Sequence, residues 1–365
     1  MNKILLFCIL TLIVFSCEIK KVAETTTTTS TTTTTIIIYV AGYSTNSSNV
    51  QVPGYWKNGV WNSLIPIDSN KNSWVTSLCI SGTDIYTSGY NTNSTGIYVP
   101  GYWKNEVWNA LIPIDSNKSA VSSTINVIGS NIYAGGFSTN TMYVPGYWKN
   151  NIWNPLTPLN SLGSCWVVSL AISGNDTYAA GICMNSSNVQ VAGYWKNGTW
   201  FEMPSLDINK NSTVNCFTLN GNDIYLGGFS TNSSDVWIPV YWKNGIWNSL
   251  PQIDQSKKYS SVNSITVSGN DIYTAGILLN SSNVQVPGYW KNGVWNSLPT
   301  IVSNGLSSVG AIIISNNDIY ITGSCSNASN GAKAPGFWKN GIWTTLPSID
   351  PTKDSSVNSI AIITN

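Results

Sequence analysis

Six aromatic and five acidic residues are the side chains of this sequence whose types and positions best suit ligand recognition. The aromatic residues have no counterpart in most copies of a repeat that fills the chain; they are Trp74, Trp166, Trp237, Tyr98, Tyr143 and Tyr259. The acidic residues lie in or beside the connections between copies; they are Asp68, Asp115, Asp207, Asp254 and Asp350. Aromatic rings stack on apolar ligand faces, and carboxylates fix polar groups through hydrogen bonds. These residues predict a surface suited to carbohydrate, with ordinary loop packing as the alternative.

The composition removes several kinds of chemistry. The chain has no histidine, so the commonest general base and the usual metal ligand are missing. Its formal net charge is +1 and it has no arginine, which leaves no basic excess for nucleic acid. No repeat copy carries a distinctive pair of carboxylates. We therefore expect no catalytic residues, metal, cofactor or nucleic-acid partner. A glycan-active hydrolase or lyase that works without histidine is the enzymatic alternative, and it would need two carboxylates about 5 to 9.5 Å apart.

The repeat is marked by the motif Tyr-Trp-Lys-Asn-Gly-x-Trp. Its first tryptophans are spaced by 47, 45, 47, 47, 48 and 48 residues; they are Trp56, Trp103, Trp148, Trp195, Trp242, Trp290 and Trp338. A second tryptophan follows each after five residues; these are Trp61, Trp108, Trp153, Trp200, Trp247, Trp295 and Trp343. A fixed period of this length indicates a repeat architecture. Because large aromatic side chains fill the space between packed sheets, we expect these fourteen tryptophans to lie mainly in the core.

Each copy contains four short segments rich in β-branched and aromatic residues. In the second copy they are Trp74 to Ser81, Asp84 to Tyr90, Ile97 to Lys104 and Val107 to Leu111. Four antiparallel strands repeated seven times predict an all-β, seven-bladed β-propeller. The chain enters the repeat at a second strand and ends with a first strand. We therefore expect residues 355–363 to join residues 36–64 and close the first blade.

Strand direction divides the connections between two faces of this propeller. The long second-to-third and fourth-to-first connections share one face, here called the long-loop face. The two tight turns of each blade share the other, the tight-turn face. The predicted ligand residues belong to the long-loop face. On the tight-turn face, we expect aspartates such as Asp84 to hydrogen-bond the local backbone. Lysines such as Lys57 are expected to be solvated, with an anionic surface as their alternative partner.

The Asn-Gly of the motif predicts a β-hairpin between the third and fourth strands. Gly59 and its counterparts suit a positive φ, and Asn151 tolerates one, whereas Glu106 should be strained there or use another turn. A two-residue loop would set Trp56 opposite Trp61, and a three-residue loop with a bulge would shift that register. The sequence leaves both open.

The repeat also resembles the kelch-type, galactose-oxidase-like propeller repeat. The resemblance rests on Tyr133-Ala134-Gly135-Gly136, on Tyr225-Leu226-Gly227-Gly228, and on Tyr55 to Trp61 followed by Leu64. It spans residues 36–365 and implies the same propeller fold. The chain departs from the pattern because most copies have one glycine and carry an extra tryptophan. Oxidase activity is not implied, since the histidine ligands of its copper site are missing.

The N-terminal residues predict a targeting segment followed by a tether. Residues 1–17 combine Lys3 with an apolar run and end in Val14-Phe15-Ser16-Cys17, which resembles the lipobox of bacterial lipoproteins. We therefore expect lipidation of Cys17, with an ordinary cleaved signal peptide as the alternative. Residues 18–35 form a Thr-rich tether and residues 36–365 the propeller. The predicted location is the bacterial cell envelope, periplasmic or surface-exposed, with a membrane contact through the lipid.

The propeller region contains an odd number of cysteines at unequal repeat positions. They are Cys79, Cys165, Cys183, Cys216 and Cys325. This pattern predicts small buried hydrophobic side chains, with a single disulfide as the alternative. Taken together, the sequence predicts an exported, lipid-anchored propeller that binds a glycan or protein through its long-loop face. An envelope scaffold protein is the alternative.

Overall fold

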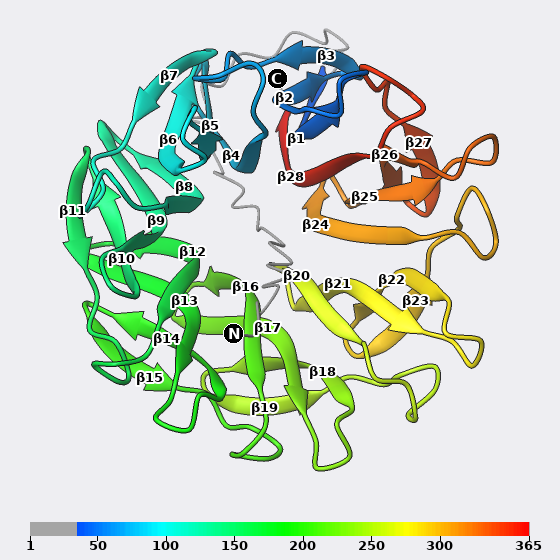
Figure 1. The fold of residues 1–365 in the computed structure, drawn as a ribbon. Helices are drawn as coiled ribbons and strands as arrows, with labels where there is room; N and C mark the ends of the chain where they lie inside the picture. Colours follow the sequence, from blue (N-terminus) through cyan, green and yellow to red (C-terminus); the bar gives the residue numbers. More distant parts are fainter. Residues whose placement is uncertain (1–34, 365) are drawn as a thin grey trace, which may run out of the picture.

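The computed structural model describes residues 35–364, in which all regular structure is β-strand. The strands form seven four-stranded antiparallel sheets, arranged as blades in a ring (Figure 1). First strands surround the centre and fourth strands lie at the rim (Figure 1). Blade 1 consists of β28, β1, β2 and β3, and blades 2 to 7 take β4 to β27 in order, four at a time. The predicted seven-bladed propeller is therefore confirmed.

The four strand positions have nearly constant lengths in all seven blades. First strands are β28 (Ser355–Thr364), β4 (Ser73–Ser81), β8 (Ala120–Ile128), β12 (Cys165–Ser173), β16 (Ser212–Asn220), β20 (Ser261–Ser268) and β24 (Ser307–Ser315). Second strands are β1 (Ile36–Thr45), β5 (Asp84–Thr92), β9 (Asn131–Thr139), β13 (Asp176–Met184), β17 (Asp223–Thr231), β21 (Asp271–Leu279) and β25 (Asp318–Ser326). Third strands are β2 (Gln51–Lys57), β6 (Tyr98–Lys104), β10 (Tyr143–Lys149), β14 (Gln190–Lys196), β18 (Trp237–Lys243), β22 (Gln285–Lys291) and β26 (Lys333–Lys339). Fourth strands are β3 (Val60–Ser63), β7 (Val107–Ala110), β11 (Ile152–Pro155), β15 (Thr199–Glu202), β19 (Ile246–Ser249), β23 (Val294–Ser297) and β27 (Ile342–Thr345).

The ring closes without a covalent link, as predicted. β28 pairs antiparallel with β1, with Val40 opposite Ile360 near the middle of the pair. The blue start of the propeller and its red end lie side by side in Figure 1. Ser44 and Ser355 share a hydrogen bond of 3.0 Å between their hydroxyl groups at the long-loop end. Closure therefore rests on backbone pairing and on packing across β1 and β28.

The first tryptophan of each motif holds neighbouring blades together. All seven are at most 1% exposed. Trp103 shows the pattern, since its indole Nε1 donates 3.0 Å to the carbonyl of Ile65 in the preceding blade. The same bond recurs around the ring, from Trp56 to Pro347 at 2.8 Å and from Trp290 to Pro251 at 3.0 Å. A buried indole N–H needs such a partner, so each wedge is fixed by both packing and a hydrogen bond.

The hairpin of the motif has a two-residue loop in every blade. Trp56 lies directly opposite Trp61, with ring centroids 4.4 Å apart. Asn58 and Gly59 both have positive φ, at 49° and 82°, as a type I′ turn requires. Glu106 keeps the same turn at φ 70°. Its carboxylate accepts a 2.9 Å hydrogen bond from the Tyr55 hydroxyl of the preceding blade, which offsets part of the strain.

The second tryptophan is half-buried and lies against a glycine. In blade 2, a Cβ on Gly101 would come within 2.3 Å of the Trp108 ring. The indole Nε1 of Trp108 is buried and has no hydrogen-bond partner in residues 35–364. Blade 5 has Val240 in place of this glycine, and its two tryptophan rings are 5.6 Å apart at 82° rather than 4.4 Å and 56° as in blade 2. The second tryptophan thus packs on the sheet without the inter-blade bond of the first.

The tight-turn face carries a repeated network of side chains. Lys104 Nζ lies 2.8 Å from Asp84 and 5.4 Å from the centroid of the Tyr86 ring. Asp84 also accepts a 2.7 Å hydrogen bond from the Asn105 side chain. The prediction that this aspartate bonds the local backbone was therefore wrong. Lys104 remains 44% exposed, in agreement with the prediction of solvated lysines, but it also forms an ion pair because strand pairing brings it to Asp84. Ile37 and Asn131 replace this aspartate in blades 1 and 3.

Two of the five cysteines in the propeller form a disulfide, which joins β12 to β13. Cys165 and Cys183 are directly opposite each other, with Cα atoms 4.1 Å apart. The prediction of buried thiols was wrong for this pair, because strand register brings together two residues at different repeat positions. Within the described residues, Cys79, Cys216 and Cys325 are buried and lie outside this disulfide, as predicted. Burial raises the pKa of the Cys216 thiol well above its ordinary value.

The predictions for the targeting segment, for Cys17 and for most of the tether lie outside the described residues. Residues 35–364 contain no helix long and apolar enough to cross a membrane. β1 begins beside the Asn58-Gly59 turn, where the Asn58 side chain accepts a 2.9 Å hydrogen bond from the backbone of Ile38. The chain therefore enters the propeller at the tight-turn face, opposite the long loops.

Candidate functional site

The long-loop face contains aromatic clusters formed by strand pairing. In blade 2, Trp74 is the second residue of β4 and lies opposite Tyr90 of β5, while Tyr98 starts β6. The ring centroid of Tyr90 is 4.9 Å from that of Trp74 and 4.8 Å from that of Tyr98. Trp74 and Tyr90 are half-buried, and Tyr98 is 36% exposed. The three rings form a contiguous cluster, here called the platform, at the end of the blade that faces away from the tight turns, and their planes are tilted to one another by 32° to 73°.

A second cluster lies between blades 5 and 6. Trp237 stacks on Phe229 with centroids 4.0 Å apart and planes 6° apart. Tyr259, in the connection to blade 6, meets Trp237 edge-on at 4.9 Å and is 59% exposed. The Trp237 carbonyl accepts a 3.1 Å hydrogen bond from the Gln252 side chain. The edge-on Tyr259 ring is the member of this cluster most open to a ligand.

The remaining two predicted aromatics are more isolated. Tyr143 stacks on Phe137 with centroids 4.3 Å apart. Trp166 is half-buried and lies opposite Ile182, directly beside the Cys165–Cys183 disulfide. The structure therefore brings together Trp74 with Tyr98, and Trp237 with Tyr259. It leaves Tyr143 and Trp166 in separate blades.

The five predicted aspartates lie in the connections of the same face and shape them. One carboxylate oxygen of each accepts a hydrogen bond from the backbone N–H two residues later, as in the 2.9 Å bond from Asn70 to Asp68. The same turn is made by Asp115, Asp207, Asp254 and Asp350. The Ser256 side chain and backbone both donate to Asp254 and hold its carboxyl pKa below the ordinary value. These aspartates preorganise the loops, and a ligand role for them stays a prediction.

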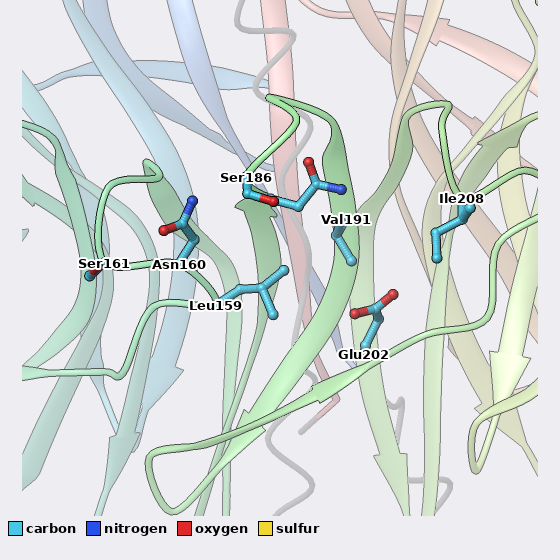
Figure 2. Close-up of a pocket in the computed structure, with 8 residues that line it drawn as sticks. Leu159, Asn160, Ser161, Ser186, Val191, Glu202 and Ile208 are labelled. Carbon is cyan, nitrogen blue, oxygen red and sulfur yellow. The ribbon is translucent and has the colours of Figure 1, made fainter.

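A pocket of about 480 Å³ opens in blade 4. Its lining comes from the connection before the blade, the β13–β14 loop, β14, β15 and the connection after it; the residues are Leu159, Asn160, Ser161, Asn185, Ser186, Val191, Glu202 and Ile208. Figure 2 shows Leu159 and Asn160 on one side, with Val191 and Glu202 on the other. The lining thus combines three aliphatic side chains, amide and hydroxyl groups, and a single carboxylate.

The connection that precedes blade 4 lacks a hydrogen bond that is present in three other blades. In blades 1, 3 and 5, a second-strand serine accepts a hydrogen bond from the connection that precedes the blade, as Ser138 does from Ile114 at 2.8 Å. Cys183 occupies this position in blade 4 and is bonded to Cys165. Within the described residues, no serine accepts an equivalent hydrogen bond from the backbone of Leu159, and the same position is also not serine in blades 2, 6 and 7. The connection that precedes blade 4 is therefore not held to the second strand by this hydrogen bond.

The pocket was not predicted from the sequence, although a signal for it was present. Glu202 replaces the small or neutral residue found at this fourth-strand position in every other blade: Ser63, Ala110, Pro155, Ser249, Ser297 and Thr345. Tyr90 and Phe229 were also missed, because comparison of copies treated each as an ordinary second-strand residue. Strand register would have paired them with Trp74 and Trp237. Within residues 35–364 no cluster of three or more His, Cys, Asp or Glu could hold a metal ion.

Comparison with known proteins finds likeness of shape alone. The sequence matches no protein-family model and no curated protein. AofleA from Arthrobotrys oligospora is 11% identical, with 79% of this chain and 88% of that chain covered and a TM-score of 0.43. The lectin SapL1, solved with alpha methyl fucoside, is 12% identical, with 75% and 95% covered and a TM-score of 0.45. At these values the likeness assigns neither a family nor a ligand. The kelch-like relationship stays a prediction.

Proposed function

We propose that the protein binds glycans through the long-loop face of its propeller. The observation that carries the proposal is the Trp74–Tyr90–Tyr98 platform of blade 2. A pyranose ring presents C–H groups on one face, and these stack on aromatic rings. The amide and carboxylate groups of the surrounding turns supply fixed hydrogen-bonding partners around such a ring.

Binding without catalysis is favoured by the polar groups at hand. Glycoside hydrolysis ordinarily needs two carboxyl groups about 5 to 9.5 Å apart across the scissile bond. Of the residues that line the blade 4 pocket, Glu202 alone is acidic. The carboxylates of the blade connections each accept hydrogen bonds that shape a turn. The geometry therefore supports a binding module over a hydrolase.

We further propose that the protein acts outside the cytoplasm, anchored through a lipid on Cys17. Two observations support this proposal. The Cys165–Cys183 disulfide suits an oxidising compartment. The chain enters the propeller at the tight-turn face, so an N-terminal anchor would leave the long-loop face directed away from the membrane. Mass spectrometry of the protein from its native membrane tests the anchor, since an unmodified Cys17 in the mature chain would contradict it.

A glycan array with the chain from residue 18 onward tests the proposed binding. We expect saturable binding to a subset of glycans, with Trp74→Ala and Tyr98→Ala each weakening it by about tenfold or more. Phe201→Ala is the matched control. Phe201 is 42% exposed and stacks on Tyr194 within blade 4, away from the platform of blade 2. Equal affinities for the wild-type protein and both platform variants would refute the site. An array with no bound glycan would refute the function.

A further inference from the structure

We propose that the blade 4 pocket is a second binding site, which takes a small hydroxylated ligand bearing a primary ammonium group, such as a 2-amino sugar. The pocket shares no residue with the aromatic platform of blade 2. Its three chemical components each constrain the ligand: one carboxylate, two amide side chains and three aliphatic side chains.

The carboxylate selects the charge. Glu202 ends β15 and is exposed at the pocket wall, on the same side as Val191 (Figure 2). Within residues 35–364 its side chain makes no hydrogen bond or ion pair, and the lining contains no lysine to neutralise it. At neutral pH a glutamate is negatively charged, so a cationic ligand group is favoured and an anionic one is disfavoured.

The amides select hydrogen-bond acceptors. Asn160 uses its side-chain oxygen to accept a 3.1 Å bond from the backbone of Leu162. Asn185 does the same for Ser187 at 2.9 Å and Val189 at 3.0 Å. Because these oxygens are engaged in turns, each amide presents its NH₂ group as the remaining donor. Hydroxyl oxygens of a ligand are suitable acceptors.

The aliphatic residues select an apolar body. Leu159 and Val191 face the pocket, and Ile208 adds a side chain that is 71% exposed. The corresponding connection residues in other blades are polar or proline: Ser69, Ser116, Ser161, Gln255, Ser303 and Pro351. Both Ile208 and Glu202 are therefore departures from the repeat that meet at one pocket. A ring with an apolar face, hydroxyl groups and an ammonium group matches all three components.

Isothermal titration of the chain from residue 18 onward with glucosamine, N-acetylglucosamine and glucose tests this proposal. We expect saturable glucosamine binding, with both uncharged sugars about fivefold weaker, as an exposed ion pair allows. Glu202→Gln should weaken glucosamine to the level of glucose, and Leu159→Trp, which fills the pocket, should abolish binding. Glu106→Gln is the control, because Glu106 lies on the tight-turn face and should leave affinity unchanged.

Three results would overturn the proposal: no saturable glucosamine binding, equal affinities for glucosamine and glucose, or unchanged glucosamine affinity in Glu202→Gln. Circular dichroism of each variant distinguishes a lost site from a lost fold. The glycan-binding proposal is tested separately, because Trp74→Ala should leave glucosamine titration unchanged while it weakens binding on the array.

Discussion

The two tryptophans of one hairpin should differ sharply in their contribution to stability. Trp103 and Trp108 lie opposite each other with ring centroids 4.4 Å apart. Only Trp103 is fully buried and donates its indole N–H across the blade boundary, to the carbonyl of Ile65 at 3.0 Å. Replacing each in turn by phenylalanine therefore compares an inter-blade wedge with a tryptophan that packs within its own sheet.

The expected cost follows from the contacts. Trp103→Phe loses one net hydrogen bond of about 1 kcal/mol and leaves the Ile65 carbonyl without that partner. The smaller ring buries less apolar surface and leaves space at the blade boundary, which adds roughly 1 to 2 kcal/mol. The total of roughly 2 to 3 kcal/mol should lower Tm by about 3 to 4 °C for a propeller of this size. Trp108→Phe removes a buried N–H that has no partner in the described residues, so its cost should stay below about 1 kcal/mol.

Differential scanning calorimetry of both variants provides the comparison. Near-ultraviolet circular dichroism checks that each variant has a folded propeller before heating. The reasoning requires Trp103→Phe to lower Tm by more than Trp108→Phe. Equal shifts for the two variants, or a larger shift for Trp108→Phe, would refute the assignment of the first tryptophan as the inter-blade wedge.

Three further predictions follow from the same structure. Glu106→Gly should raise the free energy of unfolding by about 1 kcal/mol in a Tyr55→Phe background, because glycine adopts a positive φ without strain. The Tyr55→Phe change removes the hydrogen bond to Glu106 beforehand, so its loss does not mask the gain. An unchanged Tm in that background would contradict the strain argument. The Lys291 partner lowers the pKa of Asp271 below its ordinary value of 3.8, so the pair stabilises the fold above about pH 4 and this contribution is lost as pH falls through the folded pKa. Tm measured against pH should therefore fall less steeply in acid for Asp271→Asn, and an identical acid slope would show that the pair contributes nothing. Cys165→Ser should cost roughly 3 kcal/mol, because the disulfide closes a short loop, and a reductant should lower the Tm of the wild-type protein but leave that of Cys165→Ser unchanged.

The fold could be predicted from the sequence because the same four strand-like segments and the same hairpin motif recur in seven copies. One hairpin such as Asn58-Gly59 is a local signal, but its return at a near-constant period fixes the number of blades. The closure of blade 1 followed from the strand type at each end. The hairpin register was left open because a turn sequence alone does not distinguish a two-residue loop from a bulged one. Backbone φ values at Asn58 and Gly59 decide it.

The site was less predictable because it depends on residues brought together across strands. Trp74 and Tyr98 could be identified as departures from the repeat, whereas Tyr90 between them could not, since an aromatic residue also occupies this position in other blades. Glu202 stood out by residue type, but its place in a pocket depends on how the preceding connection lies. The Cys165–Cys183 bond was missed for the same reason, because it joins different repeat positions.

The most direct test of glycan binding by the long-loop face is a crystal structure of the protein with the glycan that binds best on the array. Glycan binding through the blade 2 platform predicts a sugar ring stacked on Trp74 or Tyr98, with its hydroxyl groups near the turns of the long-loop face. A sugar bound only at the tight-turn face, among the lysine and aspartate pairs, would contradict it.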